Sequence, residues 1–260
     1  MSKMMNESDV LTGNLKDLGL PTMRRTFAAA ASAARANEQT FEQYLLGLSD
    51  AEVSHRRENR IGRLLRASKL PLEKSWSALD TKRLPGKVVH QAKALLDGSF
   101  VDRRENVLVF GPPGSGKTHL LCAVAQELVR SGRKVLFVTC NLLVQELLLA
   151  KKELRLPKAL KRLSVYPVLM VDDLGYVQQS REEMEVLFTL LAERYERGSV
   201  LLTSNLAFSG WEAIFKDPMT TAAAIDRLVH HSVIVELNVP SYRAEQAKSR
   251  RATTTPEATT

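Results

Sequence analysis

Several features that would assign this chain to other classes of protein are scarce or missing. It has only two cysteines, Cys122 and Cys140, which excludes a disulfide framework and offers no metal-binding spacing. No apolar run is long enough to cross a bilayer, and residues 1–20 lack the basic and apolar regions of a secretory signal. Acids are outnumbered, 29 against 37 lysines and arginines, and the net charge is +8. We therefore expect a cytoplasmic protein with no membrane contact and a polyanionic partner.

A glycine-rich segment stands between an apolar run typical of a buried strand, residues 107–110, and a helical pattern over residues 118–130. It has the spacing of a P-loop: Gly111, Pro112, Pro113, Gly114, Ser115, Gly116, Lys117 and Thr118. Inward-pointing N–H groups and the positive end of the following helix would cradle a polyphosphate. We expect Lys117 to reach the β- and γ-phosphates and Thr118 to ligate Mg²⁺, with His119 completing the nucleotide-binding segment. A turn without a ligand is the disfavoured alternative.

Two acids end the third apolar run and supply a second half for such a site. Residues 168–171 are typical of a buried strand, and Asp172 and Asp173 follow directly. Ligands bind at the carboxyl ends of strands in sheets of this kind. We expect Asp172 to hold Mg²⁺ and Asp173 to orient or activate the attacking water. Either acid alone could instead cap the next helix, but the pair together with the P-loop favours the catalytic interpretation.

The order of apolar runs predicts the fold. Strands expected at 107–110, 135–138, 168–171, 200–203 and 233–237 alternate with helical patterns. This alternation indicates an α/β protein with a mostly parallel five-stranded sheet flanked by helices. We expect a helical N-terminal domain at 1–70, a linker and leading helix at 71–98, the nucleotide-binding domain at 99–251 and a disordered tail at 252–260.

A basic helix is expected at 54–69. One face carries Arg56, Arg60, Arg63 and Arg66, and another carries Ile61, Leu64 and Leu65. Glu58 is the only acid among them, so ion pairing between residues four apart does not explain the charge. We expect phosphate-backbone binding, rather than a merely solvated face, by Arg56, Arg57, Arg60, Arg63, Arg66 and Lys69.

A second basic segment spans residues 151–162 and is interrupted by Pro157. It is either another DNA-facing element or a polar rim, and the sequence favours neither. The residues concerned are Lys151, Lys152, Arg155 and Lys158.

Three further polar residues follow the last strands. Asn205 comes directly after the fourth predicted strand, where an amide could approach a γ-phosphate, although it is also an ordinary turn residue. Arg227 lies on a short helix before the fifth strand, and Arg243 opens a final helix. Taken alone, both arginines are typical surface residues. An arginine supplied by a neighbouring subunit can stabilise charge on a transferring phosphate, so either would matter in a side-by-side assembly.

The ordered segments GPPGSGKT, VLMVDDLG, LLTSN, DRLVHHS and PSYR resemble AAA+ ATPases of the initiator and helicase-loader clade. Within that clade the chain is most similar to IstB-like ATP-binding proteins of insertion sequences, with DnaC-type helicase loaders as near relatives. The resemblance covers residues 100–248 and extends into the helical N-terminal region. It implies that Asn205 is sensor 1, Arg227 an arginine finger acting on a neighbour's nucleotide, and Arg243 sensor 2. Many AAA+ proteins carry Asp-Glu where this chain has Asp172-Asp173, the pair usual for the IstB and DnaC group.

Members of that family bind DNA, form ATP-dependent oligomers and assist integrase-type transposases. The resemblance therefore implies a Mg²⁺-dependent ATPase that assembles on double-stranded DNA as a ring or helix of its own copies and recruits or stimulates a transposase. ATP hydrolysis would control assembly and disassembly. The alternative is a DnaC-type loader acting on a replicative helicase. A metabolic P-loop kinase is a third possibility, but the sequence contains no candidate lid or acceptor motif.

Overall fold

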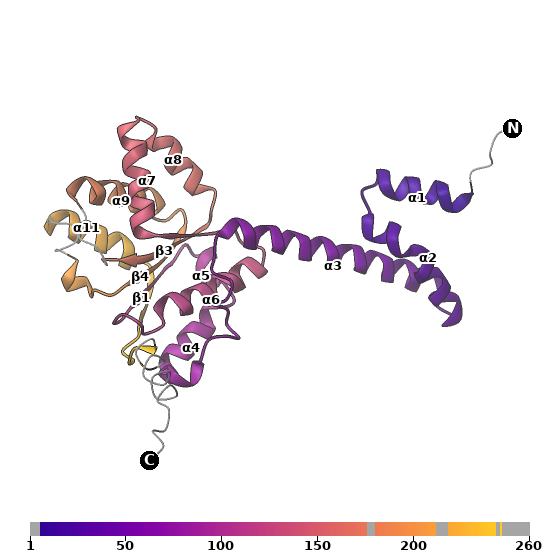
Figure 1. Cartoon of the computed structure of the whole chain (residues 1–260), viewed down its shortest axis with the longest axis horizontal. Coiled ribbons are helices and arrows are strands. Elements are labelled where there is room, and N and C mark those ends of the chain that lie inside the picture. The colour runs from indigo at the N-terminus through magenta and orange to yellow at the C-terminus, as the bar shows by residue number, and fades with distance from the viewer. Residues whose placement is uncertain (1–5, 176–179, 212–217, 243–244, 246–260) are drawn as a thin grey trace, which may run out of the picture. The chain divides into compact units, whose positions relative to one another are not determined.

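The computed structural model describes residues 6–175, 180–211, 218–242 and 245 (Figure 1). The expected tail at 252–260 and Arg243 lie outside the described residues. The chain divides between Arg63 and Leu64 into two compact units, which we take in turn. None of the described helices is long and apolar enough to cross a membrane.

The first unit contains three helices: α1 (Glu7–Asp17), α2 (Pro21–Ala36) and the greater part of α3 (Phe41–Ser68). The Asn6 side chain accepts a hydrogen bond from Ser8 N and so caps α1. Proline at the first position of α2 loses no hydrogen bond, because that N–H has no partner within a helix. The apolar residues buried in this unit are few, namely Leu15, Ala34 and Leu48.

A buried carboxylate joins α3 to the start of α2. Glu52 is 3% exposed, and its Oε2 accepts hydrogen bonds from the backbone N–H groups of Thr22 at 2.7 Å and Met23 at 3.1 Å. Arg56 donates to Glu52 Oε1 at 3.0 Å and to the Gly19 carbonyl at 2.6 Å. One acid therefore satisfies the free N–H groups at the start of α2 and favours its positive end.

The second unit is built on a five-stranded sheet in which every described pairing is parallel, with the order β2-β3-β4-β1-β5. The strands are β1 (Asn106–Phe110), β2 (Val135–Thr139), β3 (Val168–Leu174), β4 (Ser199–Ser204) and β5 (Ser232–Glu236). Each predicted apolar run forms a strand, because such runs can be buried on both faces of a parallel sheet. The predicted fold class is confirmed.

Helices cover the two faces of the sheet (Figure 1). Val107 and Val109 face one core and Leu108 and Phe110 the other, as alternate residues of a strand must. The first core is completed by α4 (Gly86–Leu95), α5 (Ser99–Asp102) and α6 (Lys117–Arg130). The second is completed by α7 (Cys140–Lys152), α8 (Leu156–Ser164), α9 (Arg181–Arg194) and α11 (Pro218–Val229). Two short 3-10 turns are η1 (Thr81–Arg83) and η2 (Phe208–Gly210).

The region expected to be a linker lies against the sheet unit. Gln126 on α6 is 1% exposed, and its Nε2 donates to the carbonyls of Pro71, Leu72 and Lys74. Trp76 packs against the same core as α4 and α6. A buried amide that satisfies three backbone carbonyls holds this segment in one path.

Candidate nucleotide-binding site

The P-loop joins β1 to α6 at the carboxyl edge of the sheet. Gly114 and Gly116 have φ of 79° and 97°, in the left-handed region that favours glycine. A Cβ on Gly111 would lie 2.4 Å from the Leu237 carbonyl oxygen, so the close approach of these two segments requires glycine. Lys117 is 6% exposed, and its Nζ donates to the carbonyls of Gly111 at 2.8 Å and Pro112 at 2.9 Å. The loop therefore curls around its own lysine.

The two acids of β3 lie on a β-bulge. Val171 pairs with Leu202 and Leu174 with Ser204, so β3 has one extra residue between these pairs. Asp173 accommodates the bulge with φ of 62°, and its side chain is exposed. Asp172 is buried, with 5% of its surface exposed. The bulge therefore places the two carboxylates in different environments. It leaves one acid fixed inside the site and the other at its surface.

Thr118 and Thr203 both contact the buried acid. The Thr118 hydroxyl donates to Asp172 Oδ1 at 2.9 Å, and the Thr203 hydroxyl donates to the same oxygen at 2.6 Å. Thr203 Oγ1 also accepts from the Asp173 N–H at 2.8 Å. Hydroxyl and carboxylate oxygens held together beside a P-loop fit the ligands that Mg²⁺ prefers. Sequence reasoning gave Thr203 no role, and its only signal was its position at the carboxyl end of a strand.

Two polar side-chain oxygens in the same region are buried without a hydrogen-bond partner among the described residues: Ser115 Oγ in the P-loop and Asn205 Oδ1. Ser204 pairs with Phe110, so the residues that follow them, Asn205 and Gly111, lie at the same edge of the sheet. Buried polar groups normally have partners. These two oxygens therefore fit a site built for a polar ligand.

The segment after β5 runs beside the P-loop. Tyr242 N–H donates to the Gly114 carbonyl at 3.0 Å. Arg83 pairs with Glu245, and its guanidinium lies 4.9 Å from the centre of the Tyr242 ring. A cavity of about 390 Å³ opens nearby between α4 and β5, with Glu236 among its lining residues. Arg243, the predicted sensor 2, lies outside the described residues.

Arg227 lies in the last turn of α11, which packs against α9. Its guanidinium lies 4.7 Å from the centre of the Phe188 ring. The next residue, Leu228, accepts a hydrogen bond through its carbonyl from the Asn106 side chain at the beginning of β1. The P-loop begins at the other end of that strand, about 13 Å away at the usual rise per residue. The main chain of Arg227 therefore lies near the amino edge of the sheet, opposite the P-loop, and its guanidinium turns back along α11 toward the Ala223 carbonyl at 3.5 Å.

His119 contacts the protein's own backbone. One of its ring nitrogens lies 3.0 Å from the Ser75 carbonyl oxygen, which ties the start of α6 to residues 71–79. Pro112 and Pro113, also predicted to contact the nucleotide, are exposed.

The predicted DNA-binding face of α3 contains one arginine that the protein itself uses. Arg56 pairs with Glu52, four residues earlier. The expectation that such ion pairs are absent is therefore wrong for this arginine. Glu52 lies one turn before Arg56 and two residues before the segment 54–69. The other five residues are exposed and have no ion-pair partner among the described residues: Arg57, Arg60, Arg63, Arg66 and Lys69.

The second basic segment divides between the end of α7 and the start of α8. Lys151 pairs with Glu185 of α9 at 2.8 Å, and Arg155 pairs with Glu153. Lys152 and Lys158 are exposed. Half of the predicted positions are thus engaged in ion pairs within the chain.

A P-loop, a strand-end carboxylate pair and a parallel sheet define a P-loop nucleotide-binding protein, and solved structures show that its fold is that of AAA+ proteins. The crystal structure of DnaI is 24% identical with a TM-score of 0.54, covering 65% of this chain and 95% of that chain. The DnaC helicase loader is 20% identical with a TM-score of 0.51, covering 63% and 98%.

The chain belongs to the family of IstB-like ATP binding proteins, which it matches over residues 13–251. It is 38% identical over 250 residues to an insertion sequence ATP-binding protein of Sinorhizobium fredii, covering 95% of this chain and 84% of that protein. It is 35% identical over 247 residues to the insertion sequence IS21 ATP-binding protein of Pseudomonas aeruginosa, covering 94% and 91%. The resemblance stated from the sequence motifs is confirmed, and ATP is the nucleotide that the family name specifies.

Proposed function

We propose that this protein is an ATP-dependent transposition helper that assembles on double-stranded DNA and recruits or stimulates an integrase-type transposase. The observation that carries the proposal is the position of two sets of residues. Thr118, Asp172 and Thr203 gather beside the P-loop, whereas Arg227 lies at the opposite edge of the sheet. Such a site is completed when the arginine of a neighbouring copy reaches it.

ATP would be held by the P-loop backbone, with Lys117 toward its terminal phosphates. Mg²⁺, if bound, would be held by Thr118 and Asp172, and it would neutralise charge that develops on the phosphates. Asp173, exposed on the bulge, is our candidate for orienting water, and Asn205 for contacting the γ-phosphate. The cavity between α4 and β5 is our candidate site for the base.

We expect assembly to depend on the same residues. A neighbour's Arg227 would stabilise the bound triphosphate only while two copies are side by side, so ATP favours the assembled state and hydrolysis loosens it. The five exposed basic residues of α3 are our candidates for DNA contact. They neutralise phosphates and give affinity without reading sequence.

A helicase loader is the second candidate, and the fold shared with the DnaC helicase loader favours it. The two functions differ in their DNA and in their partner. A loader would prefer single strands and bind a replicative helicase.

The test is ATP hydrolysis and particle size, measured together without DNA, with single strands and with duplex. We expect duplex DNA and ATP to produce large particles and faster hydrolysis, and Arg227→Ala to abolish both. Arg130→Ala, which removes an exposed arginine from the last turn of α6, is the matched control. Monomers under every condition would overturn the proposal. A preference for single strands together with helicase binding would replace it with the second candidate.

A further inference from the structure

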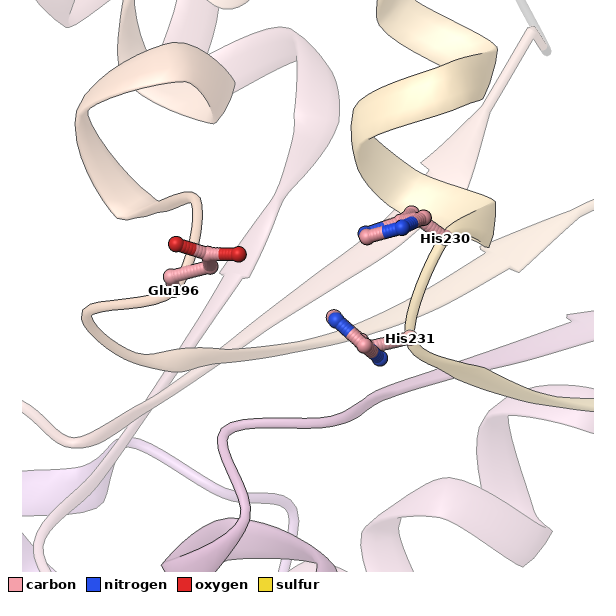
Figure 2. Close-up of side chains that lie close together, drawn as sticks. All are labelled: Glu196, His230 and His231. Carbon is pink, nitrogen blue, oxygen red and sulfur yellow. The ribbon is translucent and has the colours of Figure 1, made fainter.

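Two histidines and a glutamate meet at the amino edge of the sheet, away from the P-loop. Glu196 lies in the turn between α9 and β4, and His230 and His231 lie between α11 and β5. One potential ligand atom of each residue lies within 4.8 Å of those of the other two. Figure 2 shows the three side chains approaching one another from two separate segments. All three are exposed, so an ion could reach them from solvent.

The backbone on both sides of this cluster is held by the sheet. The His231 carbonyl accepts from Asn106 N–H at 2.7 Å, and the Glu196 carbonyl accepts from Arg104 at 2.5 Å. Glu196 has φ of 57°, a left-handed conformation that is uncommon for a residue with a side chain. The two segments are thus held by Arg104 and Asn106, at the start of β1. Binding an ion would require side-chain rotation but no change in the sheet.

Tyr195 supports one of the histidines. Its hydroxyl lies 2.9 Å from His230 Nδ1, and the rings of His230 and His231 are 4.2 Å apart. A hydrogen bond at Nδ1 leaves Nε2 as the ring nitrogen for a metal, which is the usual arrangement around metal-binding histidines.

The ligand set selects the kind of metal. Two imidazoles and one carboxylate suit Zn²⁺ and similar transition-metal ions, whereas Mg²⁺ prefers oxygen ligands. Ligand atoms around tetrahedral zinc are about 3.3 Å apart, given metal–nitrogen distances of about 2.0 Å. The ligand atoms lie within 4.8 Å of one another, so binding would require the exposed side chains to rotate toward the ion. A fourth position would remain for water or for a group from another molecule.

We infer that Glu196, His230 and His231 form a binding site for one zinc-type divalent ion. His230 follows Arg227 by three residues, so a bound ion would restrain the end of α11. An effect of the ion on assembly through Arg227 rests on the proposed function, whereas metal binding itself does not. The thiol of Cys122 is 0% exposed, and burial raises its pKa to about 12, so it is a poor ligand for an ion from solvent.

The experiment is a titration of the untagged, full-length chain with Zn²⁺ after chelator treatment, without nucleotide or Mg²⁺. We expect one Zn²⁺ per chain, and at least a tenfold loss of affinity in His231→Ala and in Glu196→Gln. Tyr195→Phe should weaken binding less than either. His90→Ala removes an exposed histidine of α4 outside the cluster and should leave affinity unchanged. Co²⁺ should give the visible absorption of a four-coordinate ion, and His231→Ala should remove it.

We expect each variant to fold, because the side chains changed are at the surface. Circular dichroism checks this. The inference is overturned if His231→Ala and Glu196→Gln bind Zn²⁺ as the unaltered chain does, or if His90→Ala loses as much affinity as they do. It is also overturned if the folded, unaltered chain binds no Zn²⁺. Because the titration contains no nucleotide, these failures do not affect the proposed function.

Discussion

At the scale of residues, Thr203 links the two acids of the candidate site. Its hydroxyl donates to Asp172 and accepts from the Asp173 backbone, so it fixes both the buried carboxylate and the bulge. The P-loop and the acid pair could be predicted because each is a contiguous pattern. Thr203 could not, because its role depends on a contact with β3, about thirty residues earlier in the chain.

We predict that Thr203→Val lowers the rate of ATP hydrolysis by about tenfold to a hundredfold, because it removes the hydrogen bond to the Asp172 carboxylate and the one that Thr203 accepts from the Asp173 N–H. It should also raise the Mg²⁺ concentration needed for half-maximal rate. Steady-state hydrolysis measured across a Mg²⁺ series checks both effects. Thr203→Ser keeps the hydroxyl and should retain most activity. An unchanged rate and Mg²⁺ dependence in the valine variant would show that Thr203 does not position Asp172.

At the scale of elements, the start of α2 depends on a residue of another helix. Burial alone would raise the pKa of Glu52, but hydrogen bonds from Met23, Arg56 and Thr22 hold it below its ordinary value. A carboxylate with a lowered pKa in the folded state contributes stability above its unfolded pKa. That contribution is lost as the pH falls through the folded pKa.

We predict that Glu52→Gln destabilises the first unit by about 1–2 kcal/mol at neutral pH, because the charge that strengthens these hydrogen bonds is gone. Hydrogen exchange in the full-length chain should show faster exchange in residues 21–36. Acidification should speed exchange there in the unaltered chain and have less effect in the variant. Glu58→Gln, an exposed change on the same helix, is the control. Equal protection of α2 in both variants would contradict the role given to Glu52.

A second prediction concerns the exposed face of α3. Changing Arg57, Arg60 and Arg63 together to Gln should weaken duplex binding and lower the slope of log affinity against log salt by about 0.9 for each phosphate that the protein no longer neutralises. Binding measured across a salt series provides the slope. Arg24, Arg25 and Arg35, exposed arginines of α2, changed together to Gln serve as the control of equal charge. A fall of the same size in both triple variants would mean that only net charge matters.

The elements also show where sequence reasoning ends. All five strands could be predicted, because strands buried on both faces are continuous apolar runs. The path of residues 71–85 could not, because it depends on Gln126, a polar residue within an otherwise apolar helix face. The pairing of Arg56 with Glu52 was missed because the acid lies just outside the basic segment. In each case a polar contact that no apolar pattern reveals determines the local structure.

At the scale of the whole molecule, the two edges of the sheet carry different residues. The carboxyl edge has the P-loop, Asp172 and Thr203, and the amino edge has Arg227 and the histidine cluster. A single copy presents half of the proposed site at each edge. Family membership and fold were within reach of the ordered motifs, whereas this separation required the hydrogen bond from Asn106 to Leu228.

The most direct test of the shared site mixes two inactive variants. Lys117→Ala keeps Arg227 but has a defective P-loop, and Arg227→Ala has the converse defect. Each alone should hydrolyse ATP at a small fraction of the normal rate on duplex DNA. When the two are mixed, some interfaces join an intact P-loop to an intact arginine, so we predict activity well above the sum of the separate rates. A mixture that never exceeds that sum, although both variants are folded and bind DNA, would contradict a site completed by the neighbouring subunit.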